Sequence, residues 1–532
     1  MSSSSYSVMS REALDLKVRN MTLLSKPIIE IYLKDTSRSV HGTYVRSFST
    51  LDKIEGEVRI TAKNDTRFDE INITFEGVAF TFVDNMSPIT TGATRVEKYR
   101  RFLFLRQPID YSTQVPQPRI IAAGATVTIP FMFVVPQKLP LSSCTHKVAN
   151  DHVKLAHLQV PPSLGDPETS GFGGRLLDDS APDMARIQYV LRVRLSRNRD
   201  SDGSENMLAQ KSKKVRIKPA VDEAPPVDAD NDPDYILRCE KGLRKFSKGR
   251  LGRLIIEAEQ PQSFRLPASP IEDAGRPVTT KARAILRFDP ASPNEQPPRL
   301  GSLSALLRAH TFFAATPRND FSSKSIMPYD MSQGHFDRGF NIFNHCMGGA
   351  QWERHDPSPS DCSRSGSHDS TNTRRTSSGS IPVPAPSSEK PPKPGCPFYT
   401  AVFLIPLTLP TSRSFPPTFH SCLISRIYTL SLDLTLHGVS MMNPKLHLRL
   451  PVQVSDEGSK DTIEERRRSE VEEQERWEGA FAAADEYFAP RRIGQPETEL
   501  PEQRRDGLPG YDADIGVRGG GGAARGLVRA VG

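Results

Sequence analysis

The sequence lacks the features that mark membrane-spanning and exported proteins. Only 36% of its 532 residues are hydrophobic. No stretch approaches the roughly 18 consecutive apolar residues of a membrane span. The opening residues, MSSSSYSVMSREALDLK, have no apolar core of the signal-peptide type. We therefore expect a cytoplasmic protein whose contact with membranes is peripheral or through partners.

The sequence also lacks the motifs of catalytic and metal-binding proteins. Its six cysteines include no CxxC pair, so neither a disulfide framework nor a zinc site is expected. His310, His335, His345 and His368 have no metal-ligand spacing. No GxSxG motif or glycine-rich phosphate loop is found, and the run Gly519–Gly522 follows no strand. We expect no catalytic residue, no metal, no cofactor and no enzymatic activity.

The net charge of +7 is modest for this length. It does not call for a nucleic acid partner, but it permits an anionic membrane surface or an acidic protein segment. Two basic segments are candidates for a single surface patch near the junction of two domains. The candidate residues are Lys211, Lys213, Lys214, Arg244, Lys245 and Lys248. The alternative is a solvated sheet edge that lysines protect from pairing.

What the sequence does contain is alternation of apolar and polar residues with a period of two. In the stretch Ile54–Phe82, Val58 and Ile60 share one face of a first strand, and Ile71 and Ile73 share one face of a second. A polar turn separates the two strands, so we interpret them as a hairpin. Because each strand has one apolar face, the hairpin predicts a second sheet that covers it.

The same alternation recurs along the chain and predicts an all-β fold. Further strands are expected at residues 27–33, 95–106, 127–135, 187–195, 211–218, 254–258, 282–288, 398–410, 422–436 and 446–454. Residues 303–308 read instead as a short helical turn. Short strands at this spacing favour β-sandwiches over βαβ units.

Composition divides the chain into segments. We expect a disordered tail at 1–27, a first β domain at 28–218, an acidic proline-rich linker at 219–234 and a second β domain at 235–455. A low-complexity insertion at about 320–396 interrupts the second domain, because its composition cannot bury enough apolar surface to fold. A tail at 456–532 contains a helix at about 461–488.

Several strand segments combine glycine, proline and apolar positions in a distinctive order. They are LDKIEGEVRI with DEINITFEGVA, GATVTIPFMFVVPQKLPLS, IQYVLRVRL, GRLIIEAEQP, and SRIYTLSLDLTL with KLHLRLPVQV. Their order and spacing resemble those of the arrestin-like proteins of filamentous fungi, in the α-arrestin branch. The resemblance implies two tandem arrestin-like (immunoglobulin-like) β-sandwiches without enzyme activity.

Members of that branch act as adaptors. The resemblance therefore implies that this protein links the cytosolic tails of membrane transporters or receptors to a HECT-type ubiquitin ligase. It also implies peripheral recruitment to the plasma membrane and endosomes, where the protein would promote endocytosis. WW domains of such ligases bind PPxY or LPxY motifs, and the tail contains one such motif at Leu508, Pro509 and Tyr511. Proline favours an extended segment that fits the aromatic groove of a WW domain, and the tyrosine supplies a second anchor.

Two further interpretations concern regulation and alternative function. Arg374 and Arg375 precede Thr376, Ser377 and Ser378, a pattern that suits a basophilic kinase with Ser377 as the favoured acceptor. The alternative function is a trafficking or signalling scaffold of arrestin fold that recruits no ligase and does not need the LPGY segment.

Overall fold

The computed structural model describes most of the chain. The described residues are 26–34, 45–86, 93–172, 175–199, 203–226, 229, 232–245, 249–267, 277–325, 330–356, 384, 397–437 and 444–459, with scattered positions between 463 and 479. The chain divides into two compact units, residues 1–469 and 470–532. The described positions between 463 and 479 are helical, and the rest of the helix expected at 461–488 lies outside the described residues.

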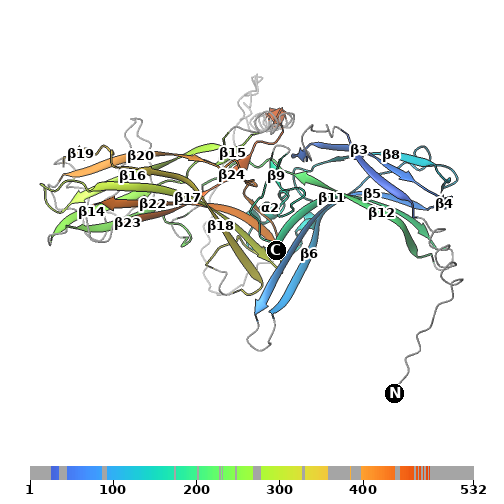
Figure 1. The fold of residues 1–532 in the computed structure, drawn as a ribbon, viewed down its shortest axis with the longest axis horizontal. Helices are drawn as coiled ribbons and strands as arrows, with labels where there is room; N and C mark the ends of the chain where they lie inside the picture. Colours follow the sequence, from blue (N-terminus) through green and yellow to red (C-terminus); the bar gives the residue numbers. More distant parts are fainter. Residues whose placement is uncertain are drawn as a thin grey trace, which may run out of the picture. The chain divides into compact units, whose positions relative to one another are not determined.

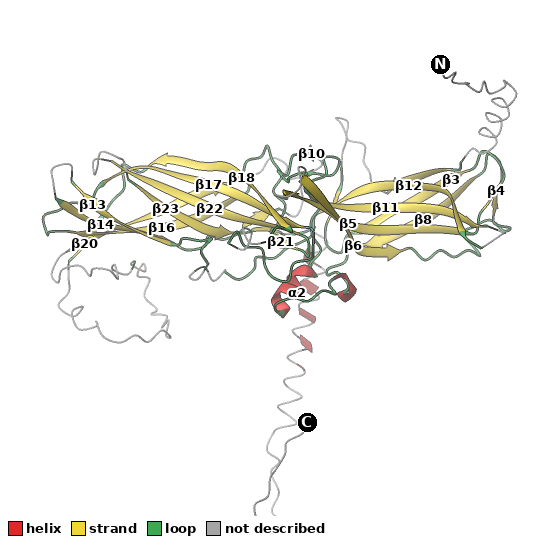
Figure 2. Ribbon diagram, turned by 90° about the horizontal axis from the view of Figure 1, so that it is seen from below, coloured by secondary structure: helices red, strands yellow, loops and turns green. Residues whose placement is uncertain are grey.

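The fold of the described residues is all-β, as predicted, with strands supplying most of its regular structure (Figures 1 and 2). Strands β1 to β12 form an N-terminal half and strands β13 to β24 form a C-terminal half. Figure 1 colours the first group blue to green and the second green to red. Among the residues with a described position, no helix is long and apolar enough to cross a membrane.

The N-terminal half contains two main sheets. The three-stranded sheet has the order β1–β3–β8, from Ile28–Leu33, Lys53–Thr61 and Thr126–Val134. The five-stranded sheet has the order β2–β12–β11–β5–β6, from Ser47–Phe48, Glu205–Ile217, Ala185–Asn198, Glu70–Met86 and Ala93–Arg106. Shorter elements are β4 (Thr66–Arg67), β7 (Ile120–Ile121), β9 (Gly171–Phe172), β10 (Arg175–Leu176), η1 (Leu141–Ser143) and α2 (Asp151–His157).

The two N-terminal sheets enclose one hydrophobic core. Alternate residues of each strand, such as Val58 on β3 and Ile73 on β5, are buried in it. The rings of Phe75 and Phe133 meet across the core with their centroids 5.9 Å apart. The expectation that the apolar faces at 54–82 need a covering sheet is therefore confirmed.

The predicted hairpin within Ile54–Phe82 is wrong, although both of its strands exist. Strand β3 pairs with β1 on one side and β8 on the other, so neither of its edges is free for β5. Strand β5 pairs with β11 and β6 in the opposite sheet. The two strands thus face each other across the core, and alternation alone does not distinguish this arrangement from a hairpin because both bury the same side chains.

The C-terminal half also has two main sheets. One has the order β13–β14–β16–β20–β19, from Arg238–Arg244, Arg250–Ala258, Thr279–Pro290, Phe398–Thr408 and Glu353–His355. The other has the order β18–β17–β22–β21, from Gln333–Cys346, Arg299–Ala314, Ile424–His437 and Phe419–His420, with β23 (Lys445–Val452) also paired to β22. Strands β15 (Phe264–Leu266) and β24 (Val454–Asp456) form a parallel pair. A second hydrophobic core lies between the two main sheets.

Two predictions fail in this half. Residues 303–308 belong to strand β17, not to a helical turn, because β18 and β22 pair with both of its edges and override the helix propensity of leucine and alanine. The prediction of a low-complexity insertion at about 320–396 is wrong for Gln333–Cys346 and Glu353–His355, which form strands β18 and β19. Strand β18 is paired on one edge only and none of its residues is fully buried, which explains its weak alternation.

Candidate functional site

A recess of about 530 Å³ lies on the outer face of the three-stranded sheet. Two apolar side chains of this face stay largely in solvent, Tyr32 at 42% and Met132 at 52% exposure. They belong to β1 and β8, the two neighbours of β3, and both line the recess. Apolar surface of this kind, in a concave site, is available to a ligand or a partner segment.

Gly56 on β3 allows the backbone of β1 and the ring of Phe131 to pack closely beside the recess. A Cβ atom at this position would lie 2.1 Å from the carbonyl oxygen of Tyr32 and 2.6 Å from the ring of Phe131. At the rim, Lys34 Nζ lies 3.2 Å from Glu55 Oε2. The recess therefore combines exposed apolar side chains with charged groups, which suits a short extended segment of mixed character.

The two halves meet in a packed interface. The N-terminal core continues into side chains of the C-terminal half, namely Phe313, Phe419, Leu423 and Ile424. The Thr81 hydroxyl on β5 donates a hydrogen bond of 2.7 Å to the carbonyl oxygen of Ala314 on β17. Both halves therefore contribute to one continuous buried region.

Arg426 on β22 is the most deeply buried cation of this interface, with 1% of its surface exposed. Its guanidinium donates to the carbonyl oxygens of Asp179 and Ser180 in the N-terminal half and to the Thr311 hydroxyl on β17. Burial raises the pKa of the Asp179 carboxyl, and the positive charge of Arg426 opposes that rise. Strand β22 thus places a cation where a loop of the other half presents carbonyl oxygens.

A buried ion pair also crosses between the halves. Lys218, which follows β12, has its Nζ 2.7 Å from Asp456 Oδ2 on β24. The side chains are only 13% and 3% exposed. The backbone of Asp456 also forms two 2.9 Å hydrogen bonds with Val221 in the expected linker, so the link involves main chain as well as charge.

Four side chains with metal-ligand chemistry converge at the same interface. Their ligand atoms all lie within 4.8 Å of one another. We call this group the Cys2His2 cluster; it consists of Cys144, His146, His157 and Cys422. The first two follow η1, the third is the last residue of α2, and the fourth lies between β21 and β22.

Most of the Cys2His2 cluster is removed from solvent. Cys144, His157 and Cys422 are 3%, 2% and 6% exposed, whereas His146 is half-buried. Burial, together with the neighbouring His146, lowers the pKa of His157 to about 4. Burial also raises the pKa of the Cys422 thiol to about 12. Spacing in the sequence missed this cluster because Cys422 is far along the chain from Cys144, His146 and His157, which are themselves close in sequence.

A second group with ligand chemistry, His310, His335 and Asp337, lies on β17 and β18. His310 Nε2 also lies 2.7 Å from the Thr429 hydroxyl. The ammonium group of Lys324 is 2.8 Å from Asp337 Oδ2, so this group already contains a cation. We interpret it as a polar network that holds β18 against β17.

The structure does not join the basic residues that the sequence suggested as one patch. Lys211, Lys213 and Lys214 lie on β12, whereas Arg244 and Lys245 lie at the end of β13 in a different sheet. Lys214 forms an ion pair with Asp166 at 3.0 Å, and Lys245 forms one with Glu295 at 2.7 Å. Lys213 donates to the carbonyl oxygen of Ile31, and Lys248 lies outside the described residues.

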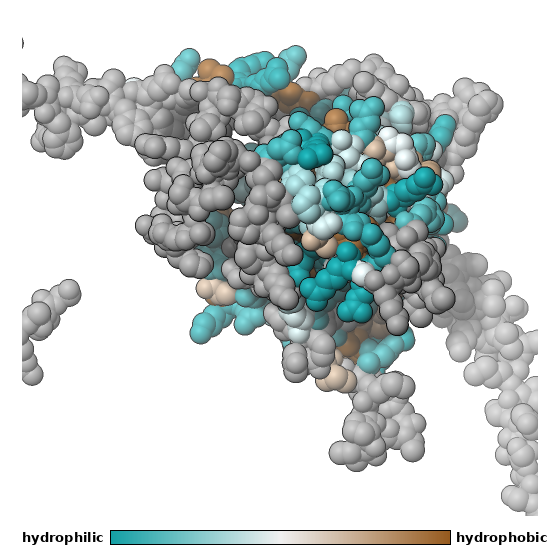
Figure 3. All heavy atoms as spheres, turned by 90° about the vertical axis from the view of Figure 1, so that its left-hand side faces the viewer, coloured by the Kyte–Doolittle hydropathy of each residue, from teal (hydrophilic) through white to brown (hydrophobic). Residues whose placement is uncertain are grey.

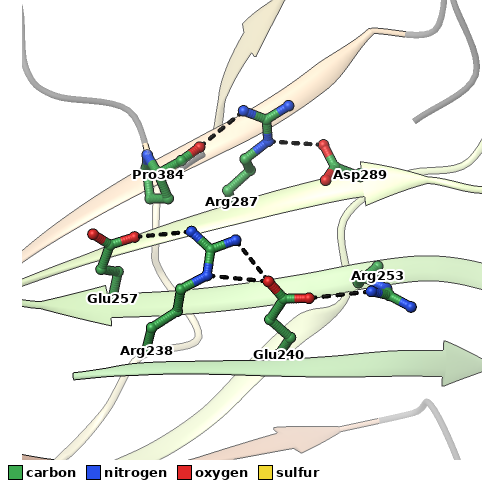
Figure 4. Close-up of polar contacts among 7 residues, drawn as sticks. All are labelled: Arg238, Glu240, Arg253, Glu257, Arg287, Asp289 and Pro384. Atoms are coloured by element: carbon green, nitrogen blue, oxygen red, sulfur yellow. Dashed lines mark hydrogen bonds and ion pairs between the residues drawn. The ribbon is translucent and has the colours of Figure 1, made fainter. Parts of the chain in front are cut away.

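Strands β13 and β14 instead carry a ladder of paired charges (Figure 4). Arg238 bridges Glu240 and Glu257 at 2.6 and 3.3 Å, and Arg253 reaches the other oxygen of Glu240 at 3.1 Å. Arg287 on β16 pairs with Asp289 and donates to the carbonyl oxygen of Pro384. Figure 3 shows that the described surface at this end of the C-terminal half is mainly hydrophilic. Because the arginines of the ladder are paired with carboxylates, the ladder carries little net positive charge.

Other predicted site residues fall in parts of the chain without a described position. These are the WW-domain motif at Leu508, Pro509 and Tyr511 and the phosphorylation candidates Thr376, Ser377 and Ser378. They remain predictions from the sequence.

Comparison with known proteins identifies no relative, since no family model and no curated protein matches the chain.

Proposed function

We propose that this protein is a non-enzymatic adaptor of arrestin type that links membrane transporters or receptors to a HECT-type ubiquitin ligase. One observation carries the proposal. The segments that resemble the α-arrestin family form strands that contribute buried residues to two successive β cores: β3, β5, β8 and β11 to the first, and β14, β22 and β23 to the second. A resemblance by chance would not be expected to select core strands in both halves.

The recess beside Tyr32 and Met132 is the surface we assign to the cargo. A cytosolic tail of a membrane protein is an extended segment, and the recess offers it apolar contacts and charged groups together. Strands β1 and β8 are the outer strands of this sheet, and a tail that displaced the Gln107 side chain from the Met132 N–H could add a main-chain hydrogen bond.

The ligase would bind at the other end of the chain, at Leu508–Tyr511. A single LPxY motif gives no avidity from repeated copies, so its affinity for one WW domain sets the strength of recruitment. The ligase motif and the cargo recess are then separate binding sites, so the protein can bind ligase and cargo at the same time, as an adaptor must.

The test is binding of the full-length chain to the WW domains of HECT-type ligases. We expect Tyr511→Ala to abolish binding and Tyr487→Ala, which changes a tail tyrosine that no LPx sequence precedes, to leave it intact. If Tyr511→Ala binds as well as the parent chain, ligase recruitment through this motif is wrong. The scaffold without ligase recruitment would then be the better description.

The cargo surface needs its own test in cells. Ubiquitin-remnant profiles of membrane proteins should lose the same sites in Tyr511→Ala and Met132→Lys, since one variant removes the ligase and the other blocks the recess. Leu404→Lys is the matched control, because Leu404 is a similarly exposed apolar residue on β20 in the other half. A Met132→Lys profile identical to that of the parent would remove the recess from the proposal.

A further inference from the structure

We propose that the Cys2His2 cluster binds one structural zinc ion that joins the two halves of the protein. This inference does not depend on the proposed adaptor function. It rests on the donor set, the distances, the orientation of one imidazole and the position of the cluster in the fold.

The distances match a tetrahedral zinc site. Zn–S bonds of about 2.3 Å and Zn–N bonds of about 2.0–2.1 Å at tetrahedral angles place sulfur and nitrogen ligands about 3.6 Å apart. Cys144 Sγ lies 3.4 Å from His146 Nε2 and 3.8 Å from His157 Nδ1. Since all four ligand atoms lie within 4.8 Å of one another, small side-chain shifts are enough to place each at bonding distance from one ion.

One histidine is already oriented as a ligand. His146 Nδ1 lies 3.1 Å from the carbonyl oxygen of Lys147 and donates its proton there. This contact leaves the lone pair of Nε2 directed at Cys144. Metal-bound histidines are commonly held in this way by a hydrogen bond from the second ring nitrogen, which fixes both the tautomer and the ring orientation.

The ligand set favours zinc in a structural role. Two cysteines and two histidines form a closed tetrahedral set, which leaves no position open for a substrate. Binding removes a proton from each thiol, so the site with Zn²⁺ is formally neutral. That neutrality matters because Arg100 and the buried Arg318 are the charged groups close to the cluster.

The loops that carry the ligands are held in place independently of a metal. Arg100 donates a hydrogen bond of 2.5 Å to the carbonyl oxygen of Ser143. The Ser143 hydroxyl in turn donates a hydrogen bond of 2.6 Å to the carbonyl oxygen of Phe102. Asn150 caps α2 through a bond from the Val153 N–H, which positions His157 at the other end of the helix. A preorganised site loses less conformational entropy when it binds.

The site would add metal coordination to an interface that packing, hydrogen bonds and an ion pair already hold together. Three ligands come from residues 144–157 of the N-terminal half and one, Cys422, from the C-terminal half. Zinc would therefore restrain the interface that also contains Arg426. The competing chemistry is a Cys144–Cys422 disulfide, which would use both thiols and exclude the metal.

The experiment measures metal in the full-length chain, purified under reducing conditions without chelators. We expect about one zinc per chain in the parent. Cys144→Ser and Cys422→Ser should each lose at least about tenfold in zinc affinity, because loss of even an outer partner of a ligand lowers metal affinity 10–100-fold. Cys346→Ser is the matched control, since Cys346 is exposed on β18. Zinc content that does not depend on Cys422 would overturn the proposal.

A second measurement avoids variants that fail to fold. The parent chain is stripped with a chelator, reduced and titrated with Co²⁺, whose absorption reports both thiolate ligation and tetrahedral geometry. We expect thiolate-to-cobalt charge-transfer bands that saturate at about one equivalent. Absence of both zinc and these bands overturns the proposal, as does a Cys144–Cys422 disulfide found after thiols are alkylated in intact cells.

Discussion

The buried pair Lys218–Asp456 offers the most direct test of how the two halves are held together. We consider Lys218→Met, which keeps the length of the side chain, and Asp456→Asn, which keeps its shape. Asp456 Oδ1 accepts a 2.9 Å hydrogen bond from the Gly458 N–H, and an asparagine oxygen can still accept it. Each variant therefore removes one charge with little change in packing.

The expected magnitude follows from the geometry. At a separation of 2.7 Å, two unit charges attract by about 6 kcal/mol at an effective dielectric constant of about 20. Desolvation offsets much of that attraction, and removal of a single partner from a buried pair costs about 3–5 kcal/mol. We expect each single variant to lose stability in this range and the double variant to recover most of it, because no unpaired charge remains buried.

The assay uses one tryptophan as a reporter. The chain has two tryptophans, and Trp352 packs at the edge of the C-terminal core. In a Trp477→Phe background, fluorescence in urea follows unfolding of the half that contains Asp456. If the free-energy losses of the two single variants simply add in the double variant, the pair is not coupled and the reasoning is wrong.

Three further predictions concern Lys218, Gly56 and Arg426. The loss of stability in Lys218→Met should shrink as pH falls from neutral towards 4. Burial raises the pKa of Asp456, and the protonated carboxyl needs no cation beside it. A loss of stability that grows over this pH range would contradict the raised pKa. Gly56→Ala should lose about 1–3 kcal/mol from overpacking against the backbone of Tyr32, measured by urea unfolding followed by circular dichroism, which reports on both halves. Gly242→Ala, at a strand position with open space, should lose nothing. Arg426→Lys should lose at least about 1.5–3 kcal/mol, because an ammonium group cannot reproduce the planar set of bonds; an unchanged urea midpoint would show that the guanidinium geometry is unimportant.

Period-two alternation located most strands but not their partners. The segment 187–195 forms the interior of β11 with Ile187, Leu191 and Val193 buried, as its pattern predicts. The same logic could not distinguish a hairpin at 54–82 from two strands in opposite sheets, because pairing depends on residues far along the chain. Leu303–Arg308 shows the opposite problem, since good helix formers became a strand through long-range pairing.

The interface residues were harder to predict than the strands. Arg426 is in phase with the apolar residues Ile424 and Tyr428, where a cation is not expected, and the loop that contains Asp179 supplies carbonyl oxygens for it. Cys422 begins the predicted strand at 422–436, and only the tertiary structure brings it to Cys144 and His157. A site that needs a ligand from so far along the chain leaves no signal in local spacing.

Strands β19 and β20 have a consequence for the part of the chain between them. Their paired ends, His355 and Phe398, are direct neighbours, with their rings stacked at 4.7 Å. Whatever length of chain joins them leaves and re-enters the sheet at one point, and each doubling of a loop adds only about 0.6 kcal/mol of closure entropy. Extra residues inserted between 357 and 383, before the Pro384 carbonyl oxygen that Arg287 contacts, should therefore add little closure entropy, which makes this stretch a suitable place for a tag.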